Sequence, residues 1–261
     1  MPERNREVFV YRPAPLVFAH RGGMGEQVAS SLTAFVAAAR LGNVGLELDI
    51  HPTVDGQLVV FHDDDLAPST NSSGPVSSFR LDELKEIVDL DGTRNSAEGR
   101  VPMVTLEEVF SSCPESSYSI DIKEDLGDDS WVEGFLANLI DTHVLNEKTV
   151  VASFLDPPLS RFRQVAGKVR TAASRSESLA WYNDYMGGVD REYPFSVLSL
   201  PLRFMGAEYL AQGVVDRAHD QGLEIWVWTV NDEGDLRRVA DMGFDVVITD
   251  YPSLALEILG G

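Results

Sequence analysis

Two acidic residues interrupt an apolar stretch that reads Leu46-Glu47-Leu48-Asp49-Ile50. On a β-strand these two carboxylates share one face and lie about 6.5 Å apart along the backbone. Their side chains can therefore reach one hard cation, which takes oxygen ligands at roughly 2.0–2.6 Å. Buried charges are costly unless they are paired or bind an ion. The spacing predicts that Glu47 and Asp49 are metal ligands, with salt bridges to distant lysines as the alternative.

Two histidines also follow apolar runs. His20 and Arg21 come after residues 16–19, and His62 comes after residues 58–61. Histidine titrates near neutral pH, with an ordinary pKa of about 6.5, so it can donate or accept a proton. Two histidines beside carboxylates suit a reaction that needs one general base and one general acid. The spacing does not say which histidine has which role.

A second pair of charged residues repeats the spacing of two on another predicted strand, at Asp121 and Lys123. Asp121 can complete the metal site, and Lys123 can bind an anionic oxygen. A local ion pair between the two is the alternative. Trp226 and Trp228 share a face of a later strand. We expect Trp228 to line a substrate pocket and Trp226 to pack in the core.

The chain begins with strand, helix and strand, which predicts a parallel pair. The strands are residues 16–20 and 45–51, and Ser31 is the expected N-cap of a helix that stops at Gly42. Only residues 52–56 then precede the next apolar run, too few for a parallel crossover. We therefore predict an antiparallel hairpin over residues 46–62, turning near Asp55 and Gly56. This turn would return His62 to the level of Asp49.

The remaining elements alternate regularly. Thr105 and Glu108 form a predicted capping box, and Val104 and Val109 a hydrophobic staple, for a helix that ends near Cys113. A short helix is expected at residues 81–88. Later helices are predicted around 131–139, 158–165, 210–218 and 232–242, and at the end of the chain. Without the returning hairpin arm, eight strands follow in parallel order, which predicts an α/β fold of the (β/α)8 TIM-barrel type. Six of them are expected at 118–123, 149–153, 169–173, 196–200, 223–230 and 245–249.

The composition of the chain disfavours several classes of partner and location. The chain has 261 residues, which we expect to form a single domain over residues 1–261, and a net charge of −21. That charge disfavours nucleic acid or an anionic membrane as a partner. Cys113 is the lone cysteine, so no intrachain disulfide is possible. The charged N-terminus resembles no signal peptide, and no run reaches the roughly 18 apolar residues of a spanning helix. We expect a cytoplasmic protein without membrane insertion that acts on a small molecule; the oligomeric state stays open.

The order of these motifs resembles the glycerophosphodiester phosphodiesterase family, a group of barrels related to phosphatidylinositol phospholipases C. The resemblance covers almost the whole chain. Single motifs are weak, but their order and spacing make the match strong. The matching motifs are H-R-G at 20–22, E-L-D at 47–49, T-x-D-G at 53–56, H-D at 62–63, P-x-x-T-L-E-E-V at 102–109, S-F at 153–154, W-T-V-N at 228–231 and I-T-D-Y-P at 248–252.

The resemblance implies a role for each matching residue. His20 and His62 would be the general acid and base, and Arg21 and Lys123 would contact the phosphate. One divalent cation, Mg²⁺ or Ca²⁺, would be bound by three carboxylates. The implied reaction is hydrolysis of a glycerophosphodiester to glycerol 3-phosphate and an alcohol. The implied metal ligands are Glu47, Asp49 and Asp121.

The chain departs from the family pattern at three places. Asp121 stands where the family usually has glutamate, and its side chain is one methylene shorter. Residues 29–31, Ala-Ser-Ser, replace the usual E-N-[ST], and the sequence leaves open whether Glu26 reaches the same space from the loop. Residues 68–70, Pro-Ser-Thr, replace the usual R-T-T.

Two rival hypotheses follow. A barrel that binds a phosphate-bearing ligand without turnover is consistent with the lost E-N motif. A phospholipase D of the sphingomyelinase D type would share the His and E-x-D arrangement. The single cysteine and the absence of a recognisable signal argue against that second rival, whose members are secreted and disulfide-bonded.

Overall fold

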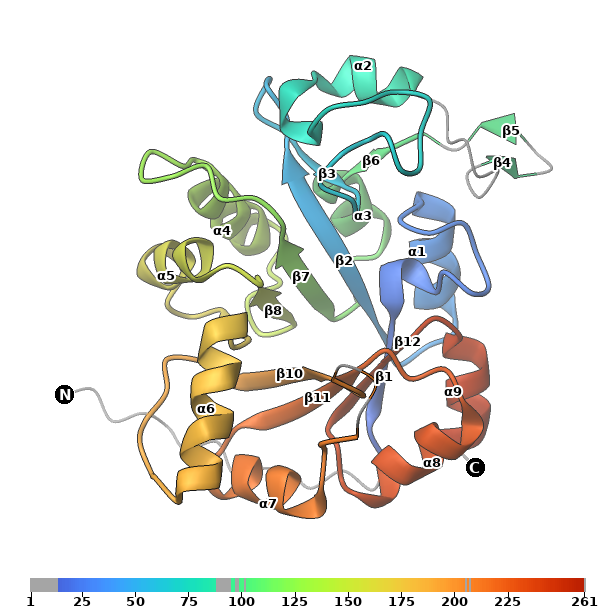
Figure 1. Ribbon diagram of the computed structural model, residues 1–261. Helices are drawn as coiled ribbons and strands as arrows, with labels where there is room; N and C mark the ends of the chain where they lie inside the picture. The colour runs from blue at the N-terminus through green and yellow to red at the C-terminus, as the bar shows by residue number, and fades with distance from the viewer. Residues whose placement is uncertain are drawn as a thin grey trace.

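A computed structural model describes residues 14–87, 95–96, 99–100, 102–204, 206 and 208–260. Eight parallel strands pair in the order β10-β11-β12-β1-β2-β7-β8-β9. A single parallel bridge from Ala172 to Val197 joins the two ends, so the sheet closes loosely into a barrel (Figure 1). The predicted TIM barrel is confirmed. Its strands are β1 (Leu16–Ala19), β2 (Val44–Pro52), β7 (Tyr118–Ile122), β8 (Thr149–Ala152), β9 (Arg170–Thr171), β10 (Val197–Pro201), β11 (Glu224–Trp228) and β12 (Val246–Thr249).

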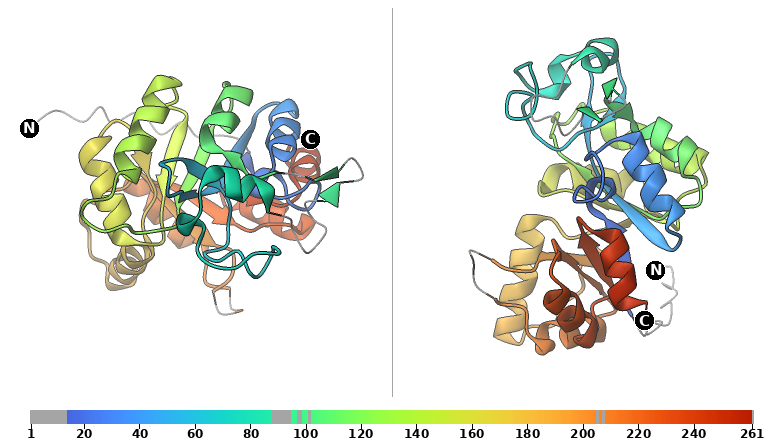
Figure 2. Two further views of the ribbon diagram at one scale, coloured as in Figure 1. Left: turned by 90° about the horizontal axis from the view of Figure 1, so that it is seen from above. Right: turned by 90° about the vertical axis from the view of Figure 1, so that its right-hand side faces the viewer.

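Helices surround the barrel on its outer side (Figures 1 and 2). Ser31 caps the first of them, accepting a hydrogen bond from the Ala34 N–H, and Thr105 and Glu108 form the predicted capping box. One helix was not predicted: α6 buries Trp181 but exposes Leu179, so it carries no simple apolar stripe. The helices are α1 (Leu32–Arg40), α3 (Leu106–Ser112), α4 (Val132–Thr142), α5 (Asp156–Val165), α6 (Arg175–Gly187), α7 (Gln212–Asp220), α8 (Glu233–Asp241) and α9 (Pro252–Leu259).

The two-residue period of the strands separates the barrel's inside from its outside. On β2, Leu46, Leu48 and Ile50 belong to the main apolar core. Glu47 and Asp49 occupy the alternate positions and therefore face the barrel interior. The same alternation on β7 places Asp121 inward beside Asp49, its partner in the strand register. Strand pairing thus brings acids from two strands to one end of the barrel.

Below these acids, a separate apolar cluster fills the barrel. Trp226 is 2% exposed and its ring lies 5.0 Å from that of Phe18. This contact confirms that Trp226 is a packing residue. The cluster keeps water out from below, so the polar groups are reached from the carboxyl ends of the strands. Its members are Phe18, Val150, Ala172, Val197, Trp226, Val246 and Ile248.

The predicted hairpin is confirmed. β3 (Leu58–Val60) pairs antiparallel with β2, and the Phe61 N–H donates to the Asp49 carbonyl at 3.1 Å. β3 also pairs with β6 (Val104–Thr105), and between them lie η2 (Val76–Ser78) and α2 (Leu81–Glu86). This insertion lies at one side of the barrel, at the top of Figure 1 and of the right-hand view in Figure 2. Residue 88, expected in its helix, lies outside the described residues.

The insertion has a small core of its own, which includes Val59, Phe61, Leu66 and Leu84. Two further short strands, β4 (Asn95–Ser96) and β5 (Gly99–Arg100), form a separate pair. Among the described residues, none of the helices is both long and apolar enough to cross a membrane.

Gly45 lies against the Phe18 ring inside the barrel, so a larger residue at this position tests the packing there. A Cβ atom there would lie 2.4 to 2.5 Å from atoms of the Phe18 ring. We expect Gly45→Ala to lower the free energy of unfolding by about 1–3 kcal/mol, because overpacking displaces the ring. Urea denaturation measures the change, and Phe18→Leu in the same chain should recover part of it.

Gly134 in α4 is the matched control, since its Cβ position is open. Gly134→Ala should leave stability unchanged or raise it by up to about 1 kcal/mol, because alanine favours a helix. Equal stability of the Gly45→Ala and wild-type chains would contradict this packing.

Candidate active site

A tight turn follows β1 and aims two site residues. It is η1 (His20–Gly22), within which Arg21 adopts the left-handed conformation with φ of 50°. Non-glycine residues rarely adopt this conformation, and it is found disproportionately at functional sites. The turn lets the Arg21 N–H donate to Glu47 Oε2 at 3.0 Å. The first strand is thereby tied directly to an acid of the second.

His20 is held by a carboxylate that the sequence analysis did not assign. Its Nδ1 lies 2.6 Å from Asp250 Oδ1, and Asn231 Nδ2 donates to Asp250 Oδ2 at 2.6 Å. Burial would raise the pKa of Asp250, but the hydrogen bonds from His20 and Asn231 hold it below its usual range. An ionised carboxylate only accepts hydrogen bonds, so Nδ1 carries the proton. Nε2 is left facing the site, 4.0 Å from Glu47 Oε2.

The same carboxylate changes the acidity of His20. Burial alone would lower the pKa of His20, but the hydrogen bond to Asp250 and the charge of Glu47 raise it above its ordinary value. The role of Asp250 was hidden in the I-T-D-Y-P motif. Because β12 pairs with β1, the residue after β12 lies beside the residue after β1. The role of Asp250 could have been predicted from the closure of the barrel, which pairs β12 with β1.

His62 has a similar arrangement on the opposite strand of the hairpin. Its Nδ1 lies 2.8 Å from Asp63 Oδ1, and Ser69 donates its hydroxyl to Asp63 Oδ2 at 2.9 Å. Burial would raise the pKa of Asp63, but the hydrogen bonds from His62 and Ser69 lower it. The Pro-Ser-Thr variation therefore still supplies a hydroxyl that holds this pair. His62 is half-buried, and its Nε2 is the nitrogen that Asp63 leaves available.

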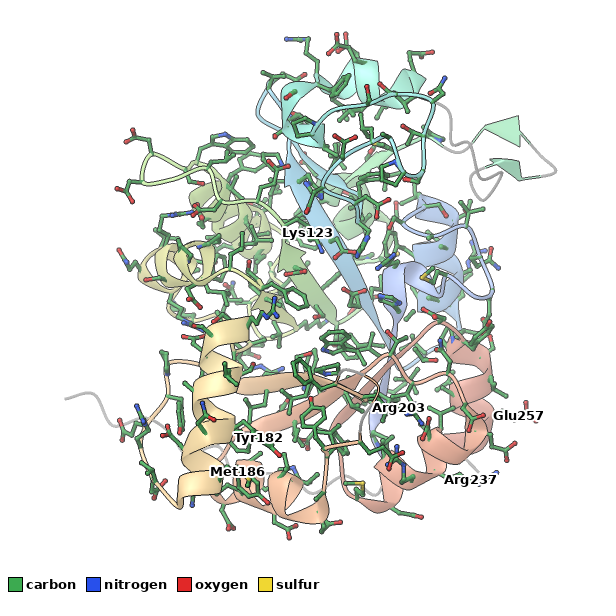
Figure 3. All side chains as sticks on the ribbon, in the orientation of Figure 1. Lys123, Tyr182, Met186, Arg203, Arg237 and Glu257 are labelled. Carbon is green, nitrogen blue, oxygen red and sulfur yellow. The ribbon has the colours of Figure 1, made fainter. Side chains whose placement is uncertain are left out.

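The carboxylates and two cations form a compact cluster. Asp49 and Asp121 are register partners on β2 and β7. Lys123 Nζ lies 3.3 Å from Asp49 Oδ1 and 3.4 Å from Asp121 Oδ2, while Arg21 Nε lies 3.6 Å from Asp49 Oδ2. Lys123 is labelled beside β2 and β7 in Figure 3. The predicted ligands and phosphate contacts therefore lie at one end of the barrel.

The three carboxylates of the cluster can carry more negative charge than its two cations, Lys123 and Arg21, neutralise. Burial, followed by the charge of Asp49, raises the pKa of both Glu47 and Asp121 well above the usual carboxyl range. Burial would lower the pKa of Lys123, but Asp49 and Asp121 raise it. Crowded, desolvated carboxylates of this kind gain stability from any added cation.

The donor chemistry fits a hard divalent cation. Asp49 Oδ2 and Asp121 Oδ1 are buried and, within the described residues, have no hydrogen-bond partner. Oxygen-only donors suit Mg²⁺ or Ca²⁺ equally. The described residues contain no group of three or more His, Cys, Asp or Glu side chains already arranged around a metal position. The Lys123 ammonium instead lies between the two aspartates.

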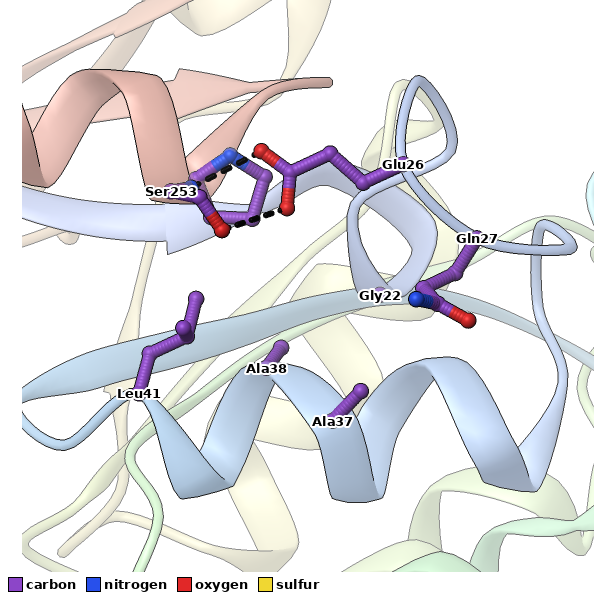
Figure 4. Close-up of a pocket in the computed structure, with 8 residues that line it drawn as sticks. Gly22, Glu26, Gln27, Ala37, Ala38, Leu41 and Ser253 are labelled. Atoms are coloured by element: carbon purple, nitrogen blue, oxygen red, sulfur yellow. Dashed lines mark hydrogen bonds between the residues drawn. The ribbon is translucent and has the colours of Figure 1, made fainter.

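Glu26 does not take the place of the missing family acid. Its carboxylate accepts hydrogen bonds from the Ser253 N–H at 2.9 Å and the Ser253 hydroxyl at 2.7 Å. This pair lines a small pocket of about 120 Å³ between α1 and the start of α9 (Figure 4). The structure thus answers the question that the sequence left open: Glu26 binds the start of α9, where a helix N-terminus stabilises an acid, instead of the cluster.

Three further side chains near the cluster are His51, Trp228 and Phe154. His51 is fully buried, and its Nδ1 lies 2.6 Å from Glu124 Oε1, so it is engaged in a structural pair. Trp228 is partly exposed, as a pocket wall requires, and its ring lies 5.8 Å from that of Phe154. Lys123 Nζ lies 5.9 Å from the centre of the same Phe154 ring.

Comparison with known proteins agrees with this geometry. The model of the glycerophosphoryl diester phosphodiesterase family matches residues 20–254. A glycerophosphodiester phosphodiesterase of Caldanaerobacter subterraneus subsp. tengcongensis is 27% identical over 249 residues, 94% of this chain and 97% of that protein. A glycerophosphodiester phosphodiesterase of Bacillus altitudinis is 26% identical over 245 residues, 93% of this chain and 97% of that protein.

A solved structure shares the fold. It is an Oleispira antarctica phosphodiesterase in complex with the product sn-glycerol-3-phosphate. Its TM-score is 0.78 at 20% sequence identity, with 95% of this chain and 98% of that chain covered. The family model and the curated relatives, together with the barrel, identify a phosphoric diester hydrolase of the TIM-barrel class. The chain belongs to the glycerophosphoryl diester phosphodiesterase family.

A substitution of Asp250 tests whether this carboxylate raises the pKa of His20. We expect Asp250→Asn to lower the pKa of His20, because the variant removes the negative charge and accepting oxygen that favour the imidazolium. The His20 titration midpoint, followed by NMR of the imidazole protons, should move to lower pH.

Asp232→Asn is the matched control. It removes one charge near the same rim and keeps an N-cap for α8, since asparagine caps helices as well as aspartate. An unchanged His20 midpoint in the Asp250→Asn protein would show that Asp250 does not hold the imidazole.

Proposed function

We propose that this enzyme hydrolyses glycerophosphodiesters to glycerol 3-phosphate and an alcohol, with His20 and His62 as the general acid and base. The observation that carries the proposal is the pairing of each histidine with its own carboxylate beside a cluster of acids and cations. Both Nδ1 atoms are engaged, by Asp250 and Asp63. Both Nε2 atoms are therefore the nitrogens available for proton transfer.

The reaction needs two proton movements. One imidazole takes the proton of the attacking hydroxyl, from water or from a neighbouring alcohol of the substrate. The other gives a proton to the departing alkoxide as the phosphorus–oxygen bond breaks. The raised pKa of His20 favours its protonated form. The two carboxylate partners follow different strands, since Asp250 comes after β12 and Asp63 after β3, so each histidine is held independently of the other.

Arg21 and Lys123 are proposed to contact the phosphate. Both are held at the carboxylates by ion pairs of 3.3 to 3.6 Å, so their positions are set before the substrate arrives. Charges fixed in advance stabilise developing negative charge without reorganisation cost. Trp228 is proposed to line the substrate's position beside them.

Glu47, Asp49 and Asp121 would hold one divalent cation, Mg²⁺ or Ca²⁺. Such a cation, when bound, would offset the negative charge of the phosphodiester and lower the pKa of an adjoining hydroxyl. The support is the raised pKa values of Glu47 and Asp121 and the two buried oxygens without hydrogen bonds among the described residues. A cytoplasmic location stays a prediction from the sequence.

A barrel that binds phosphate without turnover is the rival. It is motivated by Ala29 and Ser30, which stand where the family pattern has E-N. Against it, a binder needs no carboxylate behind each histidine. Family membership also argues against the sphingomyelinase D hypothesis.

The histidine roles are tested by single substitutions. We expect His20→Ala and His62→Ala each to reduce kcat on glycerophosphocholine by about 100- to 10,000-fold, the usual contribution of a general acid or base. Choline release is the measurement. His143→Gln, at the end of α4, is the control and should retain wild-type turnover. Wild-type turnover by either alanine variant would refute the assignment.

Cation binding has a readout that does not depend on activity. We expect Mg²⁺ or Ca²⁺ to raise the melting temperature, and to do so more at pH 8 than at pH 6. The reason is that Glu47 and Asp121, with raised pKa values, must lose their protons before they bind the ion. Differential scanning fluorimetry measures the shift.

Asp121→Asn should remove most of this shift. Asp129→Asn, the same charge change at an exposed position in the following loop, should keep it. A shift that is equal in the wild-type and Asp121→Asn proteins would place the cation elsewhere.

A further inference from the structure

The two proposed acid–base histidines are anchored to different parts of the molecule. His20 is held by Asp250, which follows a strand of the barrel. Among the residues that the structure describes, the side-chain hydrogen bonds of His62 and Asp63 run only to each other and to Ser69, which belongs to the same insertion. The position of His62 relative to the barrel therefore depends on how the insertion is attached to it.

Strand pairing ends just before His62. The pairing of β3 with β2 reaches Val60, and one further hydrogen bond runs from the Phe61 N–H to the Asp49 carbonyl. His62 is the next residue, and its side chain is 38% exposed. A half-buried residue beyond the end of a strand has few contacts that limit its motion. A contact between the insertion and the barrel near this point is therefore needed to fix the imidazole.

Glu124 makes such a contact. It follows β7, and its Oε1 lies 2.6 Å from Nδ1 of His51 on β2. Ser77 of η2, in the insertion, also forms hydrogen bonds with Glu124 through its side chain and its backbone. Burial would raise the pKa of Glu124, but the hydrogen bonds from His51 and Ser77 hold it below its usual range. One ionised carboxylate thus joins two barrel strands to the insertion above them (Figure 1).

Both contacts of Glu124 lead to the small core of the insertion. The His51 side chain is fully buried, and its ring centre lies 6.4 Å from that of Phe61. Within the described residues His51 Nε2 has no hydrogen-bond partner, so the bond to Glu124 sets the orientation of the ring. Phe61 packs in the same apolar cluster as Val76 of η2. This cluster lies directly before His62 in the chain.

We propose that Glu124 is a positioning residue: through His51 and Ser77 it docks the insertion on the barrel and so places His62 beside the substrate phosphate. The proposal rests on the role in phosphodiester hydrolysis that is proposed above for His62. Correct placement of a reacting group lowers the barrier, and a misplacement of about 1 Å can reduce the rate about 100-fold. Glu124 acts through its neighbours and needs no contact with the substrate.

Lys123, the residue before Glu124, is fixed by contacts of its own. Its backbone N–H donates to the Ile50 carbonyl at 3.2 Å. Its Nζ lies 3.3 Å from Asp49 Oδ1 and 3.4 Å from Asp121 Oδ2. Because these contacts hold both ends of the lysine, the effect of Glu124 is directed to the insertion and its histidine.

The first measurement separates kcat from KM. We expect Glu124→Ala to lower kcat on glycerophosphocholine by about 10- to 100-fold and to change KM by less than about twofold, because Arg21 and Lys123 still contact the phosphate. Glu124→Gln keeps an oxygen that accepts the hydrogen bond of His51 and should recover part of the loss. A rise in KM with unchanged kcat would overturn the proposal.

Asp245→Ala is the matched control. The Asp245 carboxylate also pairs with a histidine, since its Oδ2 lies 3.1 Å from His219 Nε2. It precedes β12, however, and so lies at the end of the barrel opposite the site. This variant removes a carboxylate–histidine contact without touching the insertion, and kcat should stay at the wild-type value. A loss equal to that of Glu124→Ala would show that such contacts act only through overall stability.

A double-mutant cycle tests whether the loss depends on His62. In a His62→Ala chain, Glu124→Ala should lower kcat further by no more than about twofold, because the group that Glu124 places is already missing. A further loss as large as that in the wild-type chain would overturn the proposal, since Glu124 would then act on some other group.

NMR gives a measurement that does not depend on turnover. The imidazole resonances of His62, identified by their loss in His62→Ala, should shift or broaden in Glu124→Ala, whereas those of His20 should stay in place. Ser77→Ala leaves the pair of Glu124 with His51 intact and should cause a smaller change in the same direction, which provides the comparison if Glu124→Ala does not fold.

Unchanged His62 resonances in both variants would overturn the proposal. A wild-type chain that does not hydrolyse glycerophosphocholine would instead remove the proposed function, and the NMR comparison would still decide whether Glu124 places His62.

Discussion

The mutual repulsion of buried carboxylates is the constraint on which the active end of the barrel depends. Burial, followed by the charge of Asp49, raises the pKa of both Glu47 and Asp121. Lys123 and Arg21 reduce this repulsion through ion pairs with Asp49. The left-handed turn at Arg21 adds a backbone hydrogen bond to Glu47. A divalent cation and an anionic phosphate together would complete the charge balance.

The position of this cluster follows from the barrel's packing. One apolar layer, centred on Phe18 and Trp226, fills the interior below it. Polar groups are therefore confined to the carboxyl ends of the strands, where loops can approach them, as in other barrels of this type. The uneven distribution of charged and aromatic residues around the mouth then gives the site a direction. The charged groups gather at the ends of β12, β1, β2 and β7, whereas the exposed Phe154, Leu155 and Phe204 follow β8 and β10.

The sequence predicted those features that depend on local spacing. The alternation of residues 46–50 predicted the inward acids. The short turn at Asp55 and Gly56 predicted that the hairpin returns His62 to about the level of Asp49, and in the structure the neighbouring Phe61 lies opposite Asp49. Contacts between segments distant in the sequence could not be predicted from local spacing. Asp250 meets His20 only because β12 closes on β1, and Glu26 meets Ser253 only in the folded chain. Helix α6 was missed because its apolar side chains do not follow a single stripe.

The central claim is that the charge cluster supports turnover of a phosphodiester and not only its binding. ³¹P NMR of the chelator-treated protein with glycerophosphocholine, before and after Mg²⁺ or Ca²⁺ is restored, tests it most directly. We expect the phosphodiester resonance to be replaced by that of glycerol 3-phosphate once the cation is present. A phosphodiester resonance that broadens on binding yet keeps its full intensity with either cation would contradict the account.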